Sequence, residues 1–117
     1  MKLAIVGSRL FEGNKLVDAI VGDIIFTNSP KEILSGGAKG VDEMADMWAC
    51  GFGIGTKIYR PQIYQWAGGF KERNMRIADE CDVLYAILSP KSKTYGAGWT
   101  ADYAEKIGKE VHRITIE

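Results

Sequence analysis

The chain has 117 residues, which is near the commonest size of a single domain and too short for a second hydrophobic core. Its 15 Lys and Arg residues balance its 15 Asp and Glu residues, so no overall charge draws the protein toward nucleic acid or an anionic membrane. We therefore expect one domain over residues 1–117, in which any anion-binding site is local.

The N-terminal residues and the cysteines bear on cellular location. The apolar run at residues 2–6 is far shorter than a signal peptide and ends at Gly7, and no apolar stretch approaches the length of a membrane span. Cys50 and Cys81 lack CxxC spacing, are too few for a zinc cage and lie in apolar contexts. These features predict two buried thiols in a reducing cytoplasm, with no metal, no other cofactor and no membrane partner.

Short apolar or β-branched runs alternate along the chain with segments of helical periodicity, which is the pattern of βαβ units around a parallel sheet. We expect five strands, at residues 2–6, 32–34, 56–59, 83–88 and 110–116. The last strand has an uneven alternation, typical of an edge strand with one face in solvent. Right-handed crossovers then predict a three-layer, Rossmann-like α/β fold with strand order 3-2-1-4-5.

Three stripes of residues at helical spacing predict helices that cover this sheet. The first crossover has a stripe at Leu16, Val17, Ile20 and Ile24. The second has a stripe at Val41, Met44, Ala45, Trp48 and Phe52. The last helix, over 97–107, has small residues on one face, at Ala97, Ala101, Ala104 and Gly108. Small residues on that face indicate close approach to the sheet.

Three glycine-bearing turns follow predicted strands and therefore lie at one edge of a parallel sheet, its carboxyl edge. They are Gly7-Ser8-Arg9, Ser35-Gly36-Gly37-Ala38-Lys39-Gly40 and Tyr95-Gly96-Ala97-Gly98-Trp99-Thr100. Glycine lets the backbone approach an anion closely, and the helix that follows offers unpaired N–H groups and a positive dipole end. Arg9 and Lys39 add full positive charges beside two of these turns. Hydroxyl groups for phosphate or ribose come from Ser8, Ser35 and Thr100.

A single turn of this kind is explained by the tight connection between a strand and a helix. Three on one edge, two of them with a cation, favour a phosphate site where the strand order reverses. None has the Walker A or GxGxxG pattern, so the sequence predicts a nucleotide site without naming its type. Asp42, which begins the second helix, is either a favourable charge at the helix dipole or a ribose contact.

A helix over 70–81 would carry an inward stripe at Phe70, Asn74, Ile77, Ala78 and Cys81. This stripe puts Asn74 among apolar positions, where its amide needs hydrogen-bond partners. Either Asn74 bonds the backbone at a strand end, or Asn74 and Arg73 reach the ligand.

Aromatic side chains in the loops contact a ligand, contact a partner subunit or cap the core. They are Tyr64, Trp66, Tyr95 and Trp99, of which we expect Trp99 to line the pocket. His112, in the last strand, has no catalytic motif around it, and we expect a structural role for it.

Together, residues 4–9, residues 35–42, Arg73-Asn74 and Gly98-Trp99-Thr100 resemble the SLOG superfamily of Rossmann-like nucleotide-binding proteins, in particular its small stand-alone members. The resemblance spans nearly the whole chain. It implies a nucleotide site at the glycine turns. It also implies a homodimer, for which the helix that carries Trp48 and the loop at Trp66 are candidate interfaces.

One branch of that superfamily, the lonely-guy phosphoribohydrolases, cleaves the N-glycosidic bond of nucleoside 5′-monophosphates. Glu72-Arg73-Asn74 looks like its ERK segment, which implies that Arg73 would hold the substrate and the developing charge. The PGGxGTxxE segment departs, because Tyr103 stands where that branch has Glu, and Asp102 and Glu105 are out of register. Such a hydrolase needs a carboxylate at the reacting bond.

The DNA-processing branch also has a GSR turn and an SGxAxGxD turn, and it binds single strands through basic residues. Such binding uses a charged groove with stacking aromatics. A minimal version here would consist of Arg9, Lys39, Lys91, Lys93 and Trp99. The balanced charge of the chain makes this the third hypothesis.

The sequence thus favours a protein that binds a nucleotide or nucleotide-derived phosphate ligand, as a sensor or sequestering protein. Hydrolysis of a nucleoside monophosphate is the alternative, with Arg73 as its catalytic residue, and single-stranded DNA binding is the third hypothesis. The predicted ligand-binding residues are Gly7, Ser8, Arg9, Ser35, Gly36, Gly37, Lys39, Asp42, Asn74, Gly98, Trp99 and Thr100.

Overall fold

The computed structural model describes residues 1–91 and 96–117. Its strands and helices alternate in the order β1 (Lys2–Gly7), α1 (Lys15–Asn28), β2 (Glu32–Ser35), α2 (Val41–Phe52), β3 (Gly55–Ile58), α3 (Lys71–Glu80), β4 (Val83–Leu88), α4 (Ala97–Lys106) and β5 (Glu110–Thr115). Two short turns of helix, at Arg9–Phe11 and Trp66–Phe70, follow β1 and precede α3.

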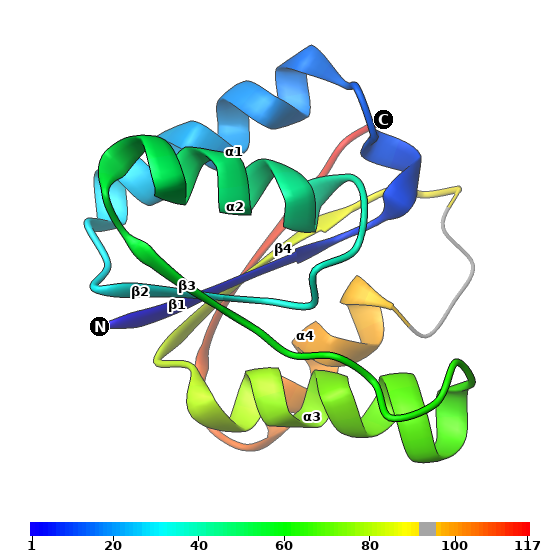
Figure 1. The fold of residues 1–117 in the computed structure, drawn as a ribbon. Coiled ribbons are helices and arrows are strands. Elements are labelled where there is room, and N and C mark those ends of the chain that lie inside the picture. The colour runs from blue at the N-terminus through cyan, green and yellow to red at the C-terminus, as the bar shows by residue number, and fades with distance from the viewer. Residues whose placement is uncertain (92–95) are drawn as a thin grey trace.

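The five strands form one parallel sheet with the order β3-β2-β1-β4-β5, which confirms the predicted Rossmann-like topology. Helices α1 and α2 cover one face of the sheet, and α3 and α4 cover the other (Figure 1). The chain runs outward from β1 to β3 and returns to the far side of β1 as β4. The strand order therefore reverses between β1 and β4, and their carboxyl ends flank that point.

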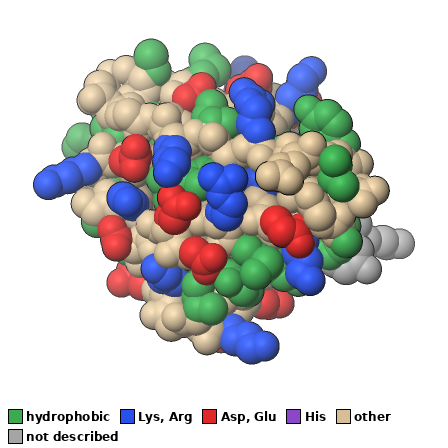
Figure 2. All heavy atoms as spheres, turned by 60° about the horizontal axis from the view of Figure 1, so that its bottom comes forward, with side chains coloured by type: hydrophobic (Ala, Val, Ile, Leu, Met, Phe, Trp, Pro, Cys, Tyr) green, Lys and Arg blue, Asp and Glu red, His purple; other side chains and the backbone are tan. Residues whose placement is uncertain are grey.

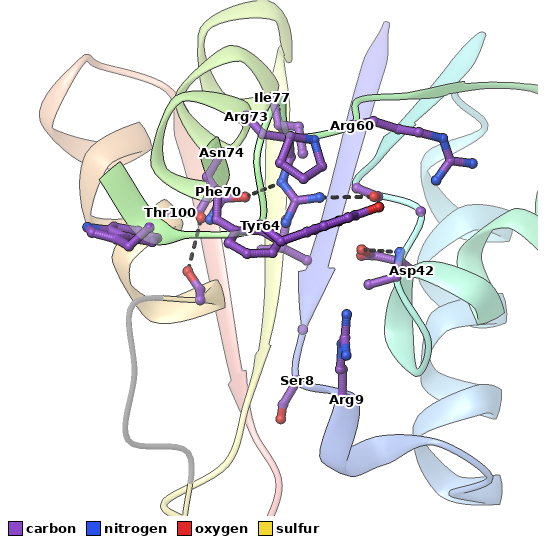
Figure 3. Close-up of a pocket in the computed structure, with 18 residues that line it drawn as sticks. Ser8, Arg9, Asp42, Arg60, Tyr64, Phe70, Arg73, Asn74, Ile77 and Thr100 are labelled. Atoms are coloured by element: carbon purple, nitrogen blue, oxygen red, sulfur yellow. Dashed lines mark hydrogen bonds between the residues drawn. The ribbon is translucent and has the colours of Figure 1, made fainter. Parts of the chain in front are cut away.

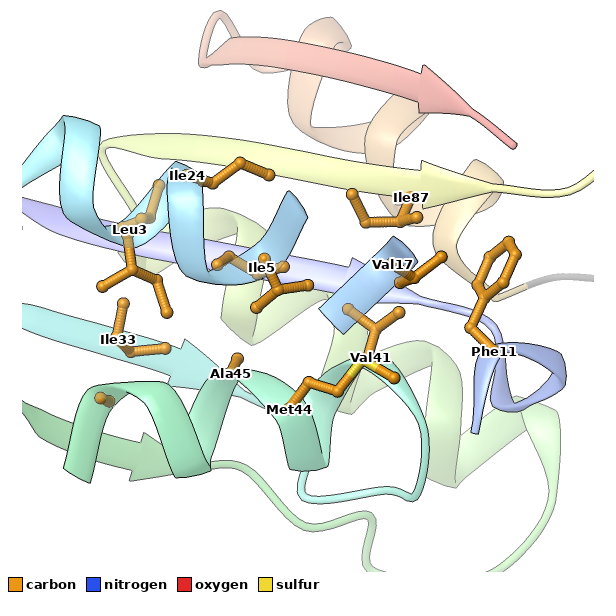
Figure 4. Close-up of a cluster of buried hydrophobic side chains, with 13 residues drawn as sticks. Leu3, Ile5, Phe11, Val17, Ile24, Ile33, Val41, Met44, Ala45 and Ile87 are labelled. Atoms are coloured by element: carbon orange, nitrogen blue, oxygen red, sulfur yellow. The ribbon is translucent and has the colours of Figure 1, made fainter. Parts of the chain in front are cut away.

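Alternation along the central strand divides the core into two layers. Leu3 and Ile5 of β1 face α1 and α2 and pack in the cluster drawn in Figure 4. Ala4 and Val6 face the opposite layer and pack with α3 and α4. Every one of these β1 side chains is buried, as expected for a central strand covered on both sides.

The predicted approach of the last helix to the sheet is confirmed, because Ala101 and Ala104 of α4 are fully buried. Strand β5 lies at an edge of the sheet, as expected, but neither of its faces is wholly in solvent. Val111 is half-buried against the layer of α3 and α4, Ile114 is half-buried against the layer of α1 and α2, and the other side chains of β5 are exposed. None of the helices in the described part of the chain has the length and apolarity needed to span a lipid bilayer.

Several burial predictions were wrong, because a helical period locates a stripe without fixing its edges. Leu16 is 61% exposed: the buried residues of α1 include Val17 and Val21, and Leu16 lies about 100° away from Val17. Phe52, in the last turn of α2, is likewise exposed. Cys50 is an exposed thiol on the outer side of α2, next to the buried Ala49, whereas Cys81 is buried as predicted.

The contact between α1 and α2 depends on a glycine. The indole of Trp48 donates a hydrogen bond to the backbone carbonyl of Asp18, at 3.0 Å, and lies directly over Gly22. A Cβ on Gly22 would be 2.6 Å from the indole ring. Trp48 is therefore committed to packing within the chain.

We predict that Gly22→Ala destabilises the protein. Overpacking costs about 1–3 kcal/mol, against a gain of about 1 kcal/mol from helix propensity, so the net loss is up to about 2 kcal/mol. Gly51→Ala is the matched control, because Gly51 lies in α2 and its Cβ position has no atom within 4 Å apart from its chain neighbours and the backbone of its own helix. That variant should gain about 0.5–1 kcal/mol. Urea unfolding measures both, and equal effects at the two sites would contradict the packing argument.

Candidate functional site

A cleft of about 630 Å³ opens at the carboxyl edge of the sheet (Figure 3). It is lined by Val6, Gly7, Ser8 and Arg9 after β1; by Gly36, Gly37, Ala38 and Asp42 after β2; by Arg60, Pro61, Tyr64, Trp66 and Phe70 after β3; by Arg73, Asn74 and Ile77 of α3; and by Gly96 and Thr100 at the start of α4. The cleft thus spans the point where the strand order reverses, which is where open α/β sheets place their ligands.

Nine of the thirteen residues predicted for the site line this cleft, and four do not. The four are Ser35, Lys39, Gly98 and Trp99. Lys39 is exposed outside the cleft, and Ser35 is fully buried, where its hydroxyl oxygen accepts a hydrogen bond from the Gly37 N–H at 3.1 Å. Ser35 therefore shapes the turn after β2. Tyr95 and Lys93 lie outside the described residues.

Trp99 packs away from the cleft, contrary to the expectation that it lines it. Its ring stacks on Tyr103 at 5.5 Å and meets Trp66 edge-on at 5.0 Å. The reason is the helix period: Thr100 faces inward, and the preceding residue of α4 is turned by about 100°. His112 of β5 stacks on Tyr85 of β4 and pairs with Glu110 of β5, away from the cleft.

The turns after β1 and β2 are built as one unit. Ser8 caps the short helical turn that follows it, since its hydroxyl oxygen accepts from the Leu10 N–H at 3.0 Å. Gly40 has φ of +83° and passes so close to Ser8 that a Cβ there would be 2.8 Å from the Ser8 carbonyl oxygen. A glycine is required at Gly40 on both counts, and it brings the two turns together at the cleft.

The guanidinium of Arg73 joins three segments of the cleft wall. Its Nη1 donates to the Gly36 carbonyl at 2.9 Å and, at a longer 3.4 Å, to the Tyr59 carbonyl. Its Nε donates to Oδ1 of Asn74 at 2.7 Å, which gives this buried amide its partner. The side chain of Asn74 thus accepts a hydrogen bond from Arg73. This differs from one of the two interpretations of the sequence, in which Asn74 bonds the backbone at a strand end. Burial lowers the pKa of Arg73, and the nearby Asp42 opposes this effect.

Asp42 is a buried carboxyl group inside the cleft. It is 8% exposed, and its Oδ2 accepts from the Ala38 N–H at 3.1 Å. Burial raises its pKa from the ordinary 3.8 to about 6, although the Ala38 hydrogen bond and the charges of Arg73 and Arg9 oppose this rise. The sequence placed Asp42 at the start of α2, and only the fold reveals its burial.

Arg60 is a cleft residue that the sequence interpretation missed. It extends along Gly37, with its Nη1 3.4 Å from the Cβ position of that glycine. A positional signal existed, because Arg60 follows the end of β3 by two residues, as Arg9 follows the end of β1. Among the residues that the structure describes, neither Arg9 nor Arg60 forms a side-chain hydrogen bond or ion pair.

The topology and the position of the cleft define an α/β protein of Rossmann type. No family model matches the sequence, and no curated protein matches it significantly. The structure is similar to that of DNA processing protein A (DprA) from Streptococcus pneumoniae, with a TM-score of 0.60 and 21% sequence identity. The match covers 94% of this chain and 57% of that one, so the chain spans little more than half of the protein it matches. This likeness shows a DprA-like Rossmann-type fold.

We predict that Asp42→Asn stabilises the protein above pH 6 and has little effect at pH 4. The folded state retains a proton on Asp42 that the unfolded state releases between the ordinary pKa of 3.8 and about 6, so the stability that this group contributes falls as pH rises through that window. The loss is on the order of 3 kcal/mol at pH 7, and asparagine avoids it while keeping an acceptor for Ala38.

Urea unfolding of both proteins between pH 4 and pH 8 measures this difference, since all other titrating groups are common to the pair. The stability gap should open between pH 4 and pH 6 and then level off. A gap that stays constant with pH would show that the carboxyl titrates normally in the folded protein.

Proposed function

We propose that the protein binds a nucleotide or nucleotide-derived phosphate ligand in this cleft, as a sensor or sequestering protein of the SLOG type. The proposal rests above all on Arg9 and Arg60, two cleft guanidinium groups that form no side-chain hydrogen bond or ion pair with the described residues. Phosphate oxygens match the forked donors of a guanidinium, and binding here would break no existing ion pair.

The size and lining of the cleft support a ligand of nucleotide dimensions. Its volume of about 630 Å³ lies in the range of small-molecule sites, and its lining combines aromatic and aliphatic side chains with charged and polar ones. In this proposal the turn at Gly7, Ser8 and Arg9 forms one wall of the phosphate site, and Gly36 with Gly37 forms another. Thr100, at the start of α4, faces the same space.

The charge of the cleft also favours an anion. Among the described residues of its lining, Arg9, Arg60 and Arg73 stand against one carboxyl group, that of Asp42. Since burial keeps Asp42 partly protonated near pH 6, the positive excess grows as the solution becomes more acidic. A bound phosphate would neutralise this excess of positive charge.

Hydrolysis of an N-glycosidic bond is the second candidate, favoured by the position of Asp42. The carboxylates of α4 are committed elsewhere, because Asp102 and Glu105 pair with Arg113 at 2.9 and 2.6 Å. Asp42 is the carboxyl group that lines the cleft, and a pKa of about 6 suits proton transfer near neutral pH. In this candidate Asp42 takes the role that the lonely-guy resemblance assigns to a glutamate.

Single-stranded DNA binding remains third, although the structural neighbour is named for DNA processing. Lys39 and Lys91 are exposed outside the cleft, and Trp99 is engaged with Trp66 and Tyr103. Figure 2 shows positive and negative side chains interspersed over the face it presents, without a continuous basic stripe there. A strand-binding groove would require clustered positive charge.

We predict that Arg9→Ala and Arg60→Ala each weaken binding of AMP or ADP by roughly 10- to 150-fold, the effect of losing a hydrogen bond to a charged group. Lys31→Ala is the matched control, because Lys31 is an exposed cation whose backbone bonds Met1 at the opposite edge of the sheet. Calorimetric titration gives the affinities. If Arg9→Ala and Arg60→Ala bind with the same affinity as Lys31→Ala and the wild type, the cleft is not the phosphate site.

Products distinguish binding from cleavage. Incubation with nucleoside monophosphates should leave the nucleotides intact while raising the melting temperature, as expected for a binding protein. Release of free base by the wild type, lost in Asp42→Asn, would establish the hydrolase instead. Stabilisation by oligonucleotides alone would replace both with the DNA-binding hypothesis.

A further inference from the structure

Tyr64 is an aromatic side chain that lines the cleft and is nevertheless 88% exposed. An aromatic ring is among the side chains that gain most from burial, so a ring held open beside a cleft has surface available for a ligand. Figure 3 shows Tyr64 reaching from the side of Phe70 into the cleft, toward the side of Asp42. Its position places it between the apolar and the charged walls.

The backbone around Tyr64 is held in a defined shape. The Phe70 N–H donates to the Gln65 carbonyl at 2.9 Å, and the Gln65 side-chain amide donates to the Ala67 carbonyl at 2.9 Å. Gly69 is buried directly against the backbone carbonyl of Ile63, so any side chain at Gly69 would overlap it. These contacts close the turn that carries Tyr64, which limits the entropy lost when a ligand binds it.

Ring contacts through Phe70 connect Tyr64 to the charged part of the cleft. Its ring lies 6.0 Å from that of Phe70, at an angle of 38°. The guanidinium of Arg73 in turn lies over the Phe70 ring, 5.4 Å from its centroid. Trp66, the third aromatic residue of the lining, packs edge-on against Trp99. Among the described aromatic residues of the lining, Tyr64 therefore has the most open ring.

We infer that Tyr64 stacks on the aromatic base of the ligand, so that the cleft prefers nucleotides to sugar phosphates and discriminates little among bases. The inference rests on the proposed phosphate site, which fixes the other end of the ligand at Arg9. Stacking on an aromatic side chain tolerates any base, because every base presents a π-face. Tyr64 then determines the class of ligand, while the arginines supply affinity for phosphate.

The test compares AMP, UMP and ribose 5-phosphate by calorimetric titration against the wild type, Tyr64→Ala and Tyr64→Phe. Loss of one base stack corresponds to roughly 5- to 150-fold in affinity. The wild type should bind AMP tighter than ribose 5-phosphate by about this factor, and UMP should fall within tenfold of AMP. Tyr64→Ala should bring the ratio of AMP to ribose 5-phosphate close to one, and Tyr64→Phe should preserve it. Phe26→Ala, an exposed aromatic residue of α1, is the matched control and should change nothing.

Each other outcome identifies what fails. If ribose 5-phosphate binds as tightly as AMP, or if Tyr64→Ala keeps the preference for AMP, Tyr64 does not hold a base and the phosphate site stands alone. If the wild type binds none of AMP, UMP and ribose 5-phosphate, the phosphate proposal fails and the inference fails with it. Loss of ribose 5-phosphate binding in Tyr64→Ala would also overturn the inference, because it would place Tyr64 against the sugar phosphate.

Discussion

The walls of the cleft are held together by the guanidinium of Arg73. A half-buried guanidinium must satisfy its donors, and here two carbonyls from the ends of β2 and β3 and the amide of Asn74 accept from it. Because two of these acceptors are backbone atoms, no change of rotamer on their side can release the contact. The first turn of α3 is thereby fixed against the turns that contain Gly36 and Tyr59, and the cleft lies between them.

That requirement divides the arginines of the cleft into two kinds. Arg73 donates hydrogen bonds from its Nε and Nη1 to other groups of the protein, which suits a residue that positions the wall. The side chains of Arg9 and Arg60 donate no hydrogen bond to the described residues, which suits groups proposed to bind an anion. Asp42 links the two kinds, because its charge interacts with both Arg73 and Arg9 while burial works against its ionisation. A ligand phosphate near Arg9 would therefore also act on the protonation of Asp42.

The sequence was sufficient for the topology and for the edge at which the cleft lies. Alternating strand and helix patterns imply a parallel sheet, and a parallel sheet brings the turns at Gly7 and Gly36 together whatever the details of packing. Burial at single positions was harder, because Phe52 and Cys50 belong to a helix whose apolar stripe is clear but whose edges depend on where the sheet ends. The pKa of Asp42 depends on burial by residues distant in sequence, which no local pattern contains.

The segment between β3 and α3 was the part least predictable from the sequence, although it contributes Arg60, Tyr64, Trp66 and Phe70 to the cleft. Non-helical backbone at Ala67 and Gly68 interrupts the helical turn before α3, and the close packing of Gly69 closes the segment. Since a Rossmann-type fold hosts many functions, a likeness in fold to DprA leaves the ligand open. In the proposed site the turns after β1 and β2 would supply general contacts to an anion, whereas Arg60 and Tyr64 come from the irregular segment. In the proposed ligand site, the preference for one ligand class would therefore depend on residues for which neither the strand pattern nor the fold alone is informative.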